Sequence, residues 1–359
     1  MLLEKKRGCS GKAFHYLIRK TEVCWLYILA FTIALLASFL LTPYVKQLAF
    51  KIGAVDKPDK RKVHTRIMPR LGGLAIYLSF LLAVVCSLPV TRDLMGILLG
   101  GTWIVIVGIL DDKYSLPAKV KLLGQILAAC ILVAFDIKIE WLNNPLGGYF
   151  YLDYLSVPFT IFWVISFINV VNLIDGLDGL AAGVSGIASI TIILVAIHQG
   201  YYPLATITAA LAGGIFGFIH YNFNPATIFM GDTGSMFIGY ILASIAIFGA
   251  VKSAATIALI VPAVALGLPI MDTAFAILRR YSNGKPIFQP DKGHLHHRLL
   301  ALGLSQRQAV LLMYAISIIL SLGAFVLAMA NVYVAAAVIV VITIAVAIGA
   351  KKIGILRNP

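Results

Sequence analysis

Polar side chains gather at the end of a long apolar stretch, where Asn172, Asp175 and Asp178 recur at three-residue spacing. Side chains three residues apart share one face of a helix, and Gly176 and Gly179 beside the acids let a ligand approach the backbone closely. An acid at mid-bilayer costs about 2.5–3.5 kcal/mol on insertion scales, so acids in an apolar stretch usually serve a function. The pattern indicates chemistry at a membrane surface.

Three more acids lie at the ends of other apolar stretches, since Asp111 and Asp112 close one and Asp232 opens another. Adjacent carboxylates suit a hard cation such as Mg²⁺, which takes oxygen ligands. An acidic helix end is a weak alternative for Asp111 and Asp112, because acids at a helix C-terminus oppose the helix dipole. For Asp232, capping of the following helix is an alternative that is compatible with metal binding. We expect the acids to form one metal and phosphate site.

The loop 279–308 carries basic and imidazole side chains. They are Arg279, Arg280, His294, His296, His297 and Arg298. A zinc site is disfavoured, because no cysteine or second histidine cluster completes four ligands. Contact with a polyanion is favoured over a merely solvated loop, because Arg pairs bidentately with phosphate oxygens. Phe229, three residues before Asp232, is a candidate for stacking on a nucleobase, with lipid or core packing as its alternative.

These residues lie at or near the ends of apolar stretches that are candidate membrane spans. Of the 359 residues, 60% are apolar and 12% charged, which predicts an all-α polytopic membrane protein. Eleven stretches are long enough to cross a bilayer: about 24–46, 71–90, 93–110, 119–135, 154–174, 180–198, 203–221, 234–251, 255–278, 309–330 and 332–350. Pro262 and Pro269 predict a kink in the ninth. We expect one transmembrane catalytic domain over 23–350, between basic tails at 1–22 and 351–359.

The charge distribution predicts an orientation. The net charge of +14 comes from Lys and Arg residues that cluster in alternate loops, which is the positive-inside pattern and not a nucleic-acid surface. All the polar clusters fall on the side with the excess. We therefore expect an active-site cleft that faces the cytoplasm, in the inner or plasma membrane. The basic segment 1–22 disagrees with this pattern, because eleven spans place it outside.

Two other classes of membrane protein fit less well. An ion-coupled transporter, which we keep as an alternative, typically shows repeated spans with broken helices at matching positions, and no such repeat is visible. The CDP-alcohol phosphotransferases also carry Asp-Gly pairs, but the Ala-Arg pair and spaced acids that follow in them are missing after Asp178.

Four ordered motifs carry a resemblance to a known family. They are Asp111-Asp112, the segment from Asn172 to Gly179, Phe229-Met230-Gly231-Asp232, and His294-Leu295-His296-His297-Arg298. In these motifs the chain resembles the polyprenyl-phosphate N-acetylhexosamine-1-phosphate transferases over about residues 40–330. Its histidine loop is similar to that of the branch that uses UDP-GlcNAc. The branch that uses UDP-MurNAc-pentapeptide usually has Pro-Phe-His-His-His-x-Glu there.

The resemblance implies residue roles. Asp232 and Asn172 would be Mg²⁺ ligands with Asp112 close by, and Mn²⁺ would be able to substitute. Asp111 and Asp112 would be catalytic, Asp111 by deprotonating the lipid phosphate. Ser115 replaces the third acid of the family's Asp-Asp-x-x-Asp pattern, which puts in doubt only a role for that position.

The other roles concern the donor. The positions expected to contact the nucleoside are Asp175, Asp178, Asn222 and Phe229. The histidine loop, with Arg279 and Arg280, would choose the sugar and hold the pyrophosphate.

The activity that the resemblance implies is transfer of GlcNAc-1-phosphate from UDP-GlcNAc to undecaprenyl phosphate, which gives undecaprenyl-diphospho-GlcNAc and UMP. This would be the first membrane step of O-antigen, common antigen or teichoic acid synthesis. Transfer of phospho-MurNAc-pentapeptide is the alternative within the superfamily. A phosphate monoester is already largely dianionic at neutral pH, so we expect direct attack rather than a covalent enzyme intermediate. A homodimer in the lipid bilayer is a further expectation.

Overall fold

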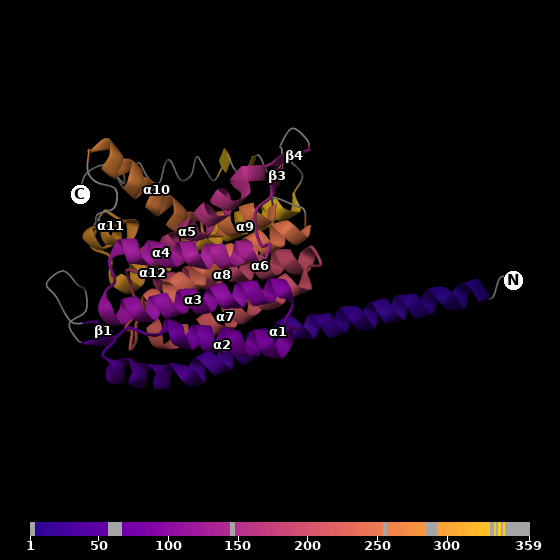
Figure 1. Cartoon of the computed structure of the whole chain (residues 1–359), viewed down its shortest axis with the longest axis horizontal. Helices are drawn as coiled ribbons and strands as arrows, with labels where there is room; N and C mark the ends of the chain where they lie inside the picture. Colours follow the sequence, from indigo (N-terminus) through magenta and orange to yellow (C-terminus); the bar gives the residue numbers. More distant parts are fainter. Residues whose placement is uncertain are drawn as a thin grey trace.

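The computed structural model describes residues 4–56, 67–143, 148–253, 257–284 and 293–330, with positions 334, 337–338 and 340–341 beyond them. Most of the described chain forms one bundle of helices (Figure 1). The helices are α1 (Glu4–Ile52), α2 (Gly73–Ser87), α3 (Arg92–Tyr114), α4 (Ala118–Ala134), α5 (Ser156–Ile174), α6 (Leu180–His198), α7 (Tyr202–Asn222), α8 (Gly231–Ser253), α9 (Ile257–Ala265), α10 (Gly267–Ser282), α11 (Leu295–Ala301) and α12 (Gln306–Met329).

The predicted class, an all-α polytopic membrane protein, is confirmed, while the count of eleven spans is not. Within the described residues, seven helices are long and apolar enough to cross a membrane, or eight if the pair α9–α10, bent by 73°, is one span. Helices also occupy the predicted spans 71–90 and 119–135, but α2 has only 15 residues and α4 only 17. At 1.5 Å per residue, α2 is shorter than the hydrocarbon core, which is about 30 Å thick. The predicted span 332–350 lies largely outside the described residues.

Helix α1 joins two parts of the chain that we expected to differ. Its backbone runs without interruption from Glu4 to Ile52, so the basic N-terminal segment continues directly into the first apolar span. In Figure 1 this segment projects well beyond the bundle. The tail 351–359 lies outside the described residues.

Helix α8 forms the centre of the bundle, and 83% of its apolar span is buried inside the protein. It packs against α2, α3, α5 and α9. Phe237 meets the rings of Tyr77 and Phe80 from α2 edge-on, each at 5.4 Å between centroids. Gly73 and Gly234 let the first turns of α2 and α8 touch, because a Cβ on Gly73 would lie 2.0 Å from the Gly234 nitrogen. The N-terminus of α8, which carries Asp232, is therefore held between helices.

Two short hairpins lie at opposite ends of the bundle (Figure 1). Strands β1 (Val55–Asp56) and β2 (Met68–Pro69) pair antiparallel beside α1, at the left end in the figure. Strands β3 (Trp141–Asn143) and β4 (Tyr149–Tyr151) pair antiparallel at the other end, followed by the 3₁₀ turn η1 (Asp153–Leu155). The ends of α3 and α5 and the starts of α6 and α8 meet at the β1–β2 end, which brings the predicted motifs together.

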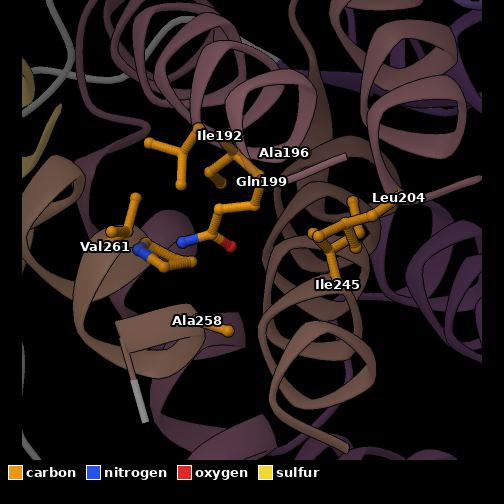
Figure 2. A pocket seen from close by; sticks show the side chains of 9 residues that line it. Ile192, Ala196, Gln199, Leu204, Ile245, Ala258 and Val261 are labelled. Atoms are coloured by element: carbon orange, nitrogen blue, oxygen red, sulfur yellow. The ribbon is translucent and has the colours of Figure 1, made fainter. Parts of the chain in front are cut away.

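An apolar pocket lies at the far end of α6, between α6, α7, α8 and α9 (Figure 2). Its walls are Ile192, Ala196, Leu204 and Val261 with their neighbours, and Gln199 supplies a polar tip. The pocket contains none of the acids or histidines identified in the sequence.

Candidate active site

Asp112 anchors the N-terminus of α8. Its two carboxylate oxygens accept hydrogen bonds from the backbone N–H of Asp232 at 2.8 Å, the N–H of Thr233 at 2.9 Å and the Thr233 hydroxyl at 2.6 Å. The side chain is fully buried. A carboxylate at this place satisfies N–H groups that have no partner within the helix. Its negative charge also interacts favourably with the positive end of the helix dipole. Asp112 thereby fixes where Asp232 lies.

Asp111 and Asp232 share one ammonium group. Lys121, in the first turn of α4, lies 3.1 Å from Asp111 Oδ2 and 2.9 Å from Asp232 Oδ2. The other oxygen of Asp111 accepts the backbone N–H of Leu116 at 2.7 Å, in the turn that ends α3. This turn returns the chain into α4 and so brings the lysine back over the acid pair.

Arg70 closes the cluster from the other side. Its guanidinium lies 2.8 Å from Asp232 Oδ1 and 3.3 Å from Asp112 Oδ1. Burial alone would lower the pKa of Arg70, but the charges of Asp112 and Asp232 outweigh burial and raise it. The residue is placed by its backbone, because Phe229 N–H donates to Pro69 and Gly72 N–H donates to Phe229. Two cations and three carboxylates therefore meet at the start of α8.

The segment after α5 adds an amide and a further acid. Asn172 donates its side-chain N–H to Ser235 Oγ at 2.8 Å, one turn into α8. The carboxylate of Asp175 makes no hydrogen bond with any described residue. Burial, followed by the charge of Asp232, raises the pKa of Asp175 to about 7. Asp175 is thus a half-buried acid that is free to contact a ligand.

Asp178 and Asn222 connect the loops around the site. Asp178 accepts hydrogen bonds from the Asn224 side chain at 3.0 Å and the Ala226 N–H at 3.1 Å. The Asn222 amide accepts from Gly179 N–H at 3.1 Å and donates to the Ile228 carbonyl at 3.0 Å. Asn222 is buried and engages the backbone on both sides. Its contribution in the structure is to position the half-buried Phe229 and the segment 175–179, and not to face solvent itself.

The histidine loop is held by an acid that the sequence motifs do not include. Asp272 of α10 accepts the Leu295 N–H at 2.8 Å through Oδ1, and its Oδ2 lies 2.9 Å from His294 Nδ1. The rings of His294 and His296 are parallel within 6°, with centroids 5.9 Å apart. The ring of His297 lies 4.2 Å from that of His296.

His296 joins this loop to the acid-bearing segment. It is 2% exposed, and its buried Nδ1 has no hydrogen-bond partner among the described residues. Burial, reinforced by the neighbouring His297, lowers the pKa of His296 to about 3, so the ring is neutral near pH 7. A Cβ on Gly176 would lie 2.6 Å from His296 Nε2. The lack of a side chain at position 176 therefore lets the two motifs touch.

Three arginines lie around the same loop. Arg279 and Arg280 are buried near the end of α10, and Arg298 donates its Nε–H to the Gly293 carbonyl at 3.1 Å. A Cβ on Gly293 would lie 2.3 Å from Arg279 Nη2. The loop backbone thus packs directly on a guanidinium.

The donor set fits a hard divalent cation. Among the described residues, no group of three or more His, Cys, Asp or Glu side chains is arranged to hold a metal. The point between Asp111 and Asp232 nevertheless stabilises a positive charge, since both carboxylates face the Lys121 ammonium. Carboxylate oxygens with Asn172 nearby are the kind of ligands that Mg²⁺ takes. The oxygens of Asp112 are engaged by α8, so the geometry favours Asp111 over Asp112 as the partner of Asp232.

The predicted residues form two adjoining groups, one of carboxylates and one of imidazoles and arginines. The sequence pattern indicates Arg70 and Lys121 only as positive-inside charges, and it predicts no role for Asp272. The available signals were positions in the sequence: Arg70 lies two residues before Gly72, and Lys121 lies nine residues after Asp112 in the first turn of the next helix.

Comparisons with known proteins identify the family of the chain. The model of glycosyl transferase family 4 matches residues 94–250. The chain is 44% identical over 307 residues, 85% of its length and 86% of the relative's, to the probable undecaprenyl-phosphate N-acetylglucosaminyl 1-phosphate transferase of Bacillus subtilis. It is 38% identical to the decaprenyl-phosphate N-acetylglucosaminephosphotransferase of Mycobacterium tuberculosis H37Rv, over 83% of the chain and 81% of the relative. It is 30% identical to the undecaprenyl-phosphate alpha-N-acetylglucosaminyl 1-phosphate transferase of Haemophilus influenzae, over 81% and 84%.

Proposed function

The chain belongs to glycosyl transferase family 4, and we propose that it transfers GlcNAc-1-phosphate from UDP-GlcNAc to undecaprenyl phosphate. The products are undecaprenyl-diphospho-GlcNAc and UMP. The relatives' names supply the acceptor and the transferred group. The observation that carries the proposal is the cluster in which Lys121 and Arg70 converge on Asp111, Asp112 and Asp232.

The two cations suit a reaction between anions. The donor pyrophosphate and the acceptor phosphate repel one another, and transfer requires their charges to be neutralised while they approach. Lys121 and Arg70 are each partly exposed, at 28% and 32% of their side chains. They can therefore exchange some carboxylate contacts for phosphate oxygens without leaving the site.

Mg²⁺ is part of the proposal. Asp232 and Asp111, with Asn172, would hold it, and when bound it would supply positive charge to the phosphates. Asp112 would hold Asp232 in place through the start of α8. The same preference for oxygen ligands makes Mn²⁺ a candidate substitute.

Direct attack is the mechanism that we propose. An oxygen of the dianionic lipid phosphate forms a bond to the β-phosphorus of UDP-GlcNAc, and the bond from that phosphorus to the bridging oxygen breaks with its electron pair leaving on UMP. The acceptor needs little help from a base, because its second pKa is near 6. Asp112 is a poor covalent nucleophile, since both of its oxygens already accept hydrogen bonds.

The remaining groups suit the donor. Phe229 and Asp175 lie beside the cluster as candidates to contact uridine, and the arginines of the histidine loop are candidates for phosphate contact. The excess of Lys and Arg in the loops at this end supports a cytoplasmic active site, which is where a soluble nucleotide sugar is available. We place the reaction at the first membrane step of an envelope polysaccharide.

A donor comparison tests this function. Purified protein in detergent is mixed with undecaprenyl phosphate and with either UDP-GlcNAc or UDP-MurNAc-pentapeptide, and UMP release is measured with and without Mg²⁺. We expect release only with UDP-GlcNAc and only with the metal. Release from the MurNAc donor would assign the chain to the other branch. Absence of release with both donors would reject the proposed activity.

A further inference from the structure

Both carboxylate oxygens of Asp272 make hydrogen bonds to the histidine loop. Oδ1 accepts the Leu295 N–H at 2.8 Å and Oδ2 meets His294 Nδ1 at 2.9 Å. Asp272 and His294 are both buried. The acid is 22 residues away in the chain and belongs to α10, on the far side of the 73° bend. It lies outside the cluster of Asp111, Asp112 and Asp232.

This contact selects one form of the His294 ring. A carboxylate only accepts hydrogen bonds, so Nδ1 must carry the proton that lies between the two groups. In the neutral ring, Nε2 is then a hydrogen-bond acceptor. Among the described residues, none contributes a hydrogen bond to Nε2. The second contact, to Leu295 N–H, fixes the carboxylate and hence the direction of the ring.

The neighbouring His296 extends the same surface. Its ring is parallel to that of His294, and it is 2% exposed with an Nδ1 that no described residue hydrogen-bonds. A buried polar atom without a partner costs free energy unless a ligand or water satisfies it. The two rings therefore form a built surface with unused hydrogen-bonding capacity. It adjoins Gly176, one residue after the free carboxylate of Asp175.

The polarity of this surface matches a sugar better than a phosphate. Ionised phosphate oxygens only accept hydrogen bonds, and so they cannot pair with an accepting Nε2. Sugar hydroxyls and the N–H of an N-acetyl group donate. Given the proposed function, on which this inference rests, we propose that Asp272 is a positioning residue that presents His294 Nε2 as an acceptor to the N-acetyl sugar of the donor.

The test compares a ligand that has the sugar with one that lacks it. Asp272→Asn keeps the size of the side chain but offers His294 an N–H or a weaker acceptor, which disturbs the ring's tautomer. We expect the KM for UDP-GlcNAc to rise on the order of tenfold, as for other partners that orient a histidine. The inhibition constant of UMP, which lacks the N-acetyl sugar and keeps only ribose, should stay within about twofold. Asp272→Glu should recover part of the loss, because it restores an accepting carboxylate.

Two further variants separate positioning from general damage. Asp136→Asn is the matched control. In the described part of the chain the Asp136 side chain pairs with Arg92 alone, at an exposed site, and Asn also tolerates its positive φ of 62°. This variant should behave as wild type. His294→Ala should raise the KM, and adding Asp272→Asn to it should change the KM little further, because residues that act through one another are not additive.

The outcomes are distinct. An unchanged KM in Asp272→Asn, or an equal loss of UMP affinity, overturns the positioning role. An additive double variant overturns the action through His294. If wild-type protein releases no UMP from UDP-GlcNAc, the proposed function itself is wrong.

Discussion

The adjacent acids Asp111 and Asp112 should respond differently to the same isosteric change. Asp112→Asn replaces an acceptor-only group that receives two backbone N–H groups, one hydroxyl and the Arg70 guanidinium. The amide has one accepting oxygen, so at least one N–H at the start of α8 loses its partner in either orientation. Because the side chain is fully buried, water cannot replace the lost contact.

The size of the effect follows from these contacts. Removing one partner of a buried charged pair costs about 3–5 kcal/mol, which includes the unpaired N–H and the lost interaction with the helix dipole. Asp111→Asn loses less structure, since its oxygens accept the Leu116 N–H and meet the partly exposed Lys121 but do not hold the start of a helix. We estimate about 1 kcal/mol for that change, the typical net value of one hydrogen bond. Both variants should lose transfer activity.

Thermal unfolding in detergent, followed by tryptophan fluorescence, distinguishes the two variants. Asp112→Asn should unfold well below wild type, whereas Asp111→Asn should unfold close to it while releasing almost no UMP. If Asp112→Asn is as stable as wild type, or if Asp111→Asn is the less stable of the two, Asp112 does not hold the start of α8 as described.

Three other predictions use different contacts. Lys121→Met should lower kcat/KM by roughly 30–1,000-fold, which is about 2–4 kcal/mol for two charge-assisted hydrogen bonds at a partly exposed site. Its control is Lys119→Met, at an exposed position of the same helix. Equal activities of the two variants would contradict a role of Lys121 in the reaction. Gly176→Ala should raise the donor KM with little change in stability, because its Cβ would lie 2.6 Å from His296 Nε2; an unchanged KM would count against contact between the motifs. The pKa of His296 lies below its unfolded value of about 6.5, so its contribution to stability is complete above about pH 7.5 and decreases as the pH falls. Between about pH 7.5 and 5 the loss is about 2 kcal/mol, and His296→Gln should remove it from the pH dependence of the unfolding midpoint.

The positions of the helices could be predicted from the local composition of the sequence. Apolar runs located the helices, because hydrocarbon solvent requires every spanning segment to satisfy its own backbone. Composition could not separate full spans from shorter helices such as α2, which is 15 residues long. That difference depends on where turns cut an apolar run. The bend between α9 and α10 falls at Leu266, within the segment from Pro262 to Pro269 where prolines weaken the helix.

The site could be predicted where its residues are costly in a membrane. Asp111, Asp175 and Asp232 drew attention because acids are rare in apolar stretches. Arg70 and Lys121 did not, since basic residues at span ends are common as positive-inside anchors. Their role depends on contacts across 162 and 111 residues of sequence. For the same reason the sequence could not separate Asp112, which holds α8, from Asp111, which faces the ammonium.

In the proposed reaction, the carboxylate–cation cluster catalyses the transfer of GlcNAc-1-phosphate to a lipid phosphate. The direct measurement quantifies UMP and undecaprenyl-diphospho-GlcNAc in the same reaction of wild type and Asp232→Asn. We predict equal amounts of the two products in wild type, dependent on undecaprenyl phosphate, and neither product in the variant, although it folds. UMP formed without the lipid product, or normal turnover in Asp232→Asn, would contradict the account.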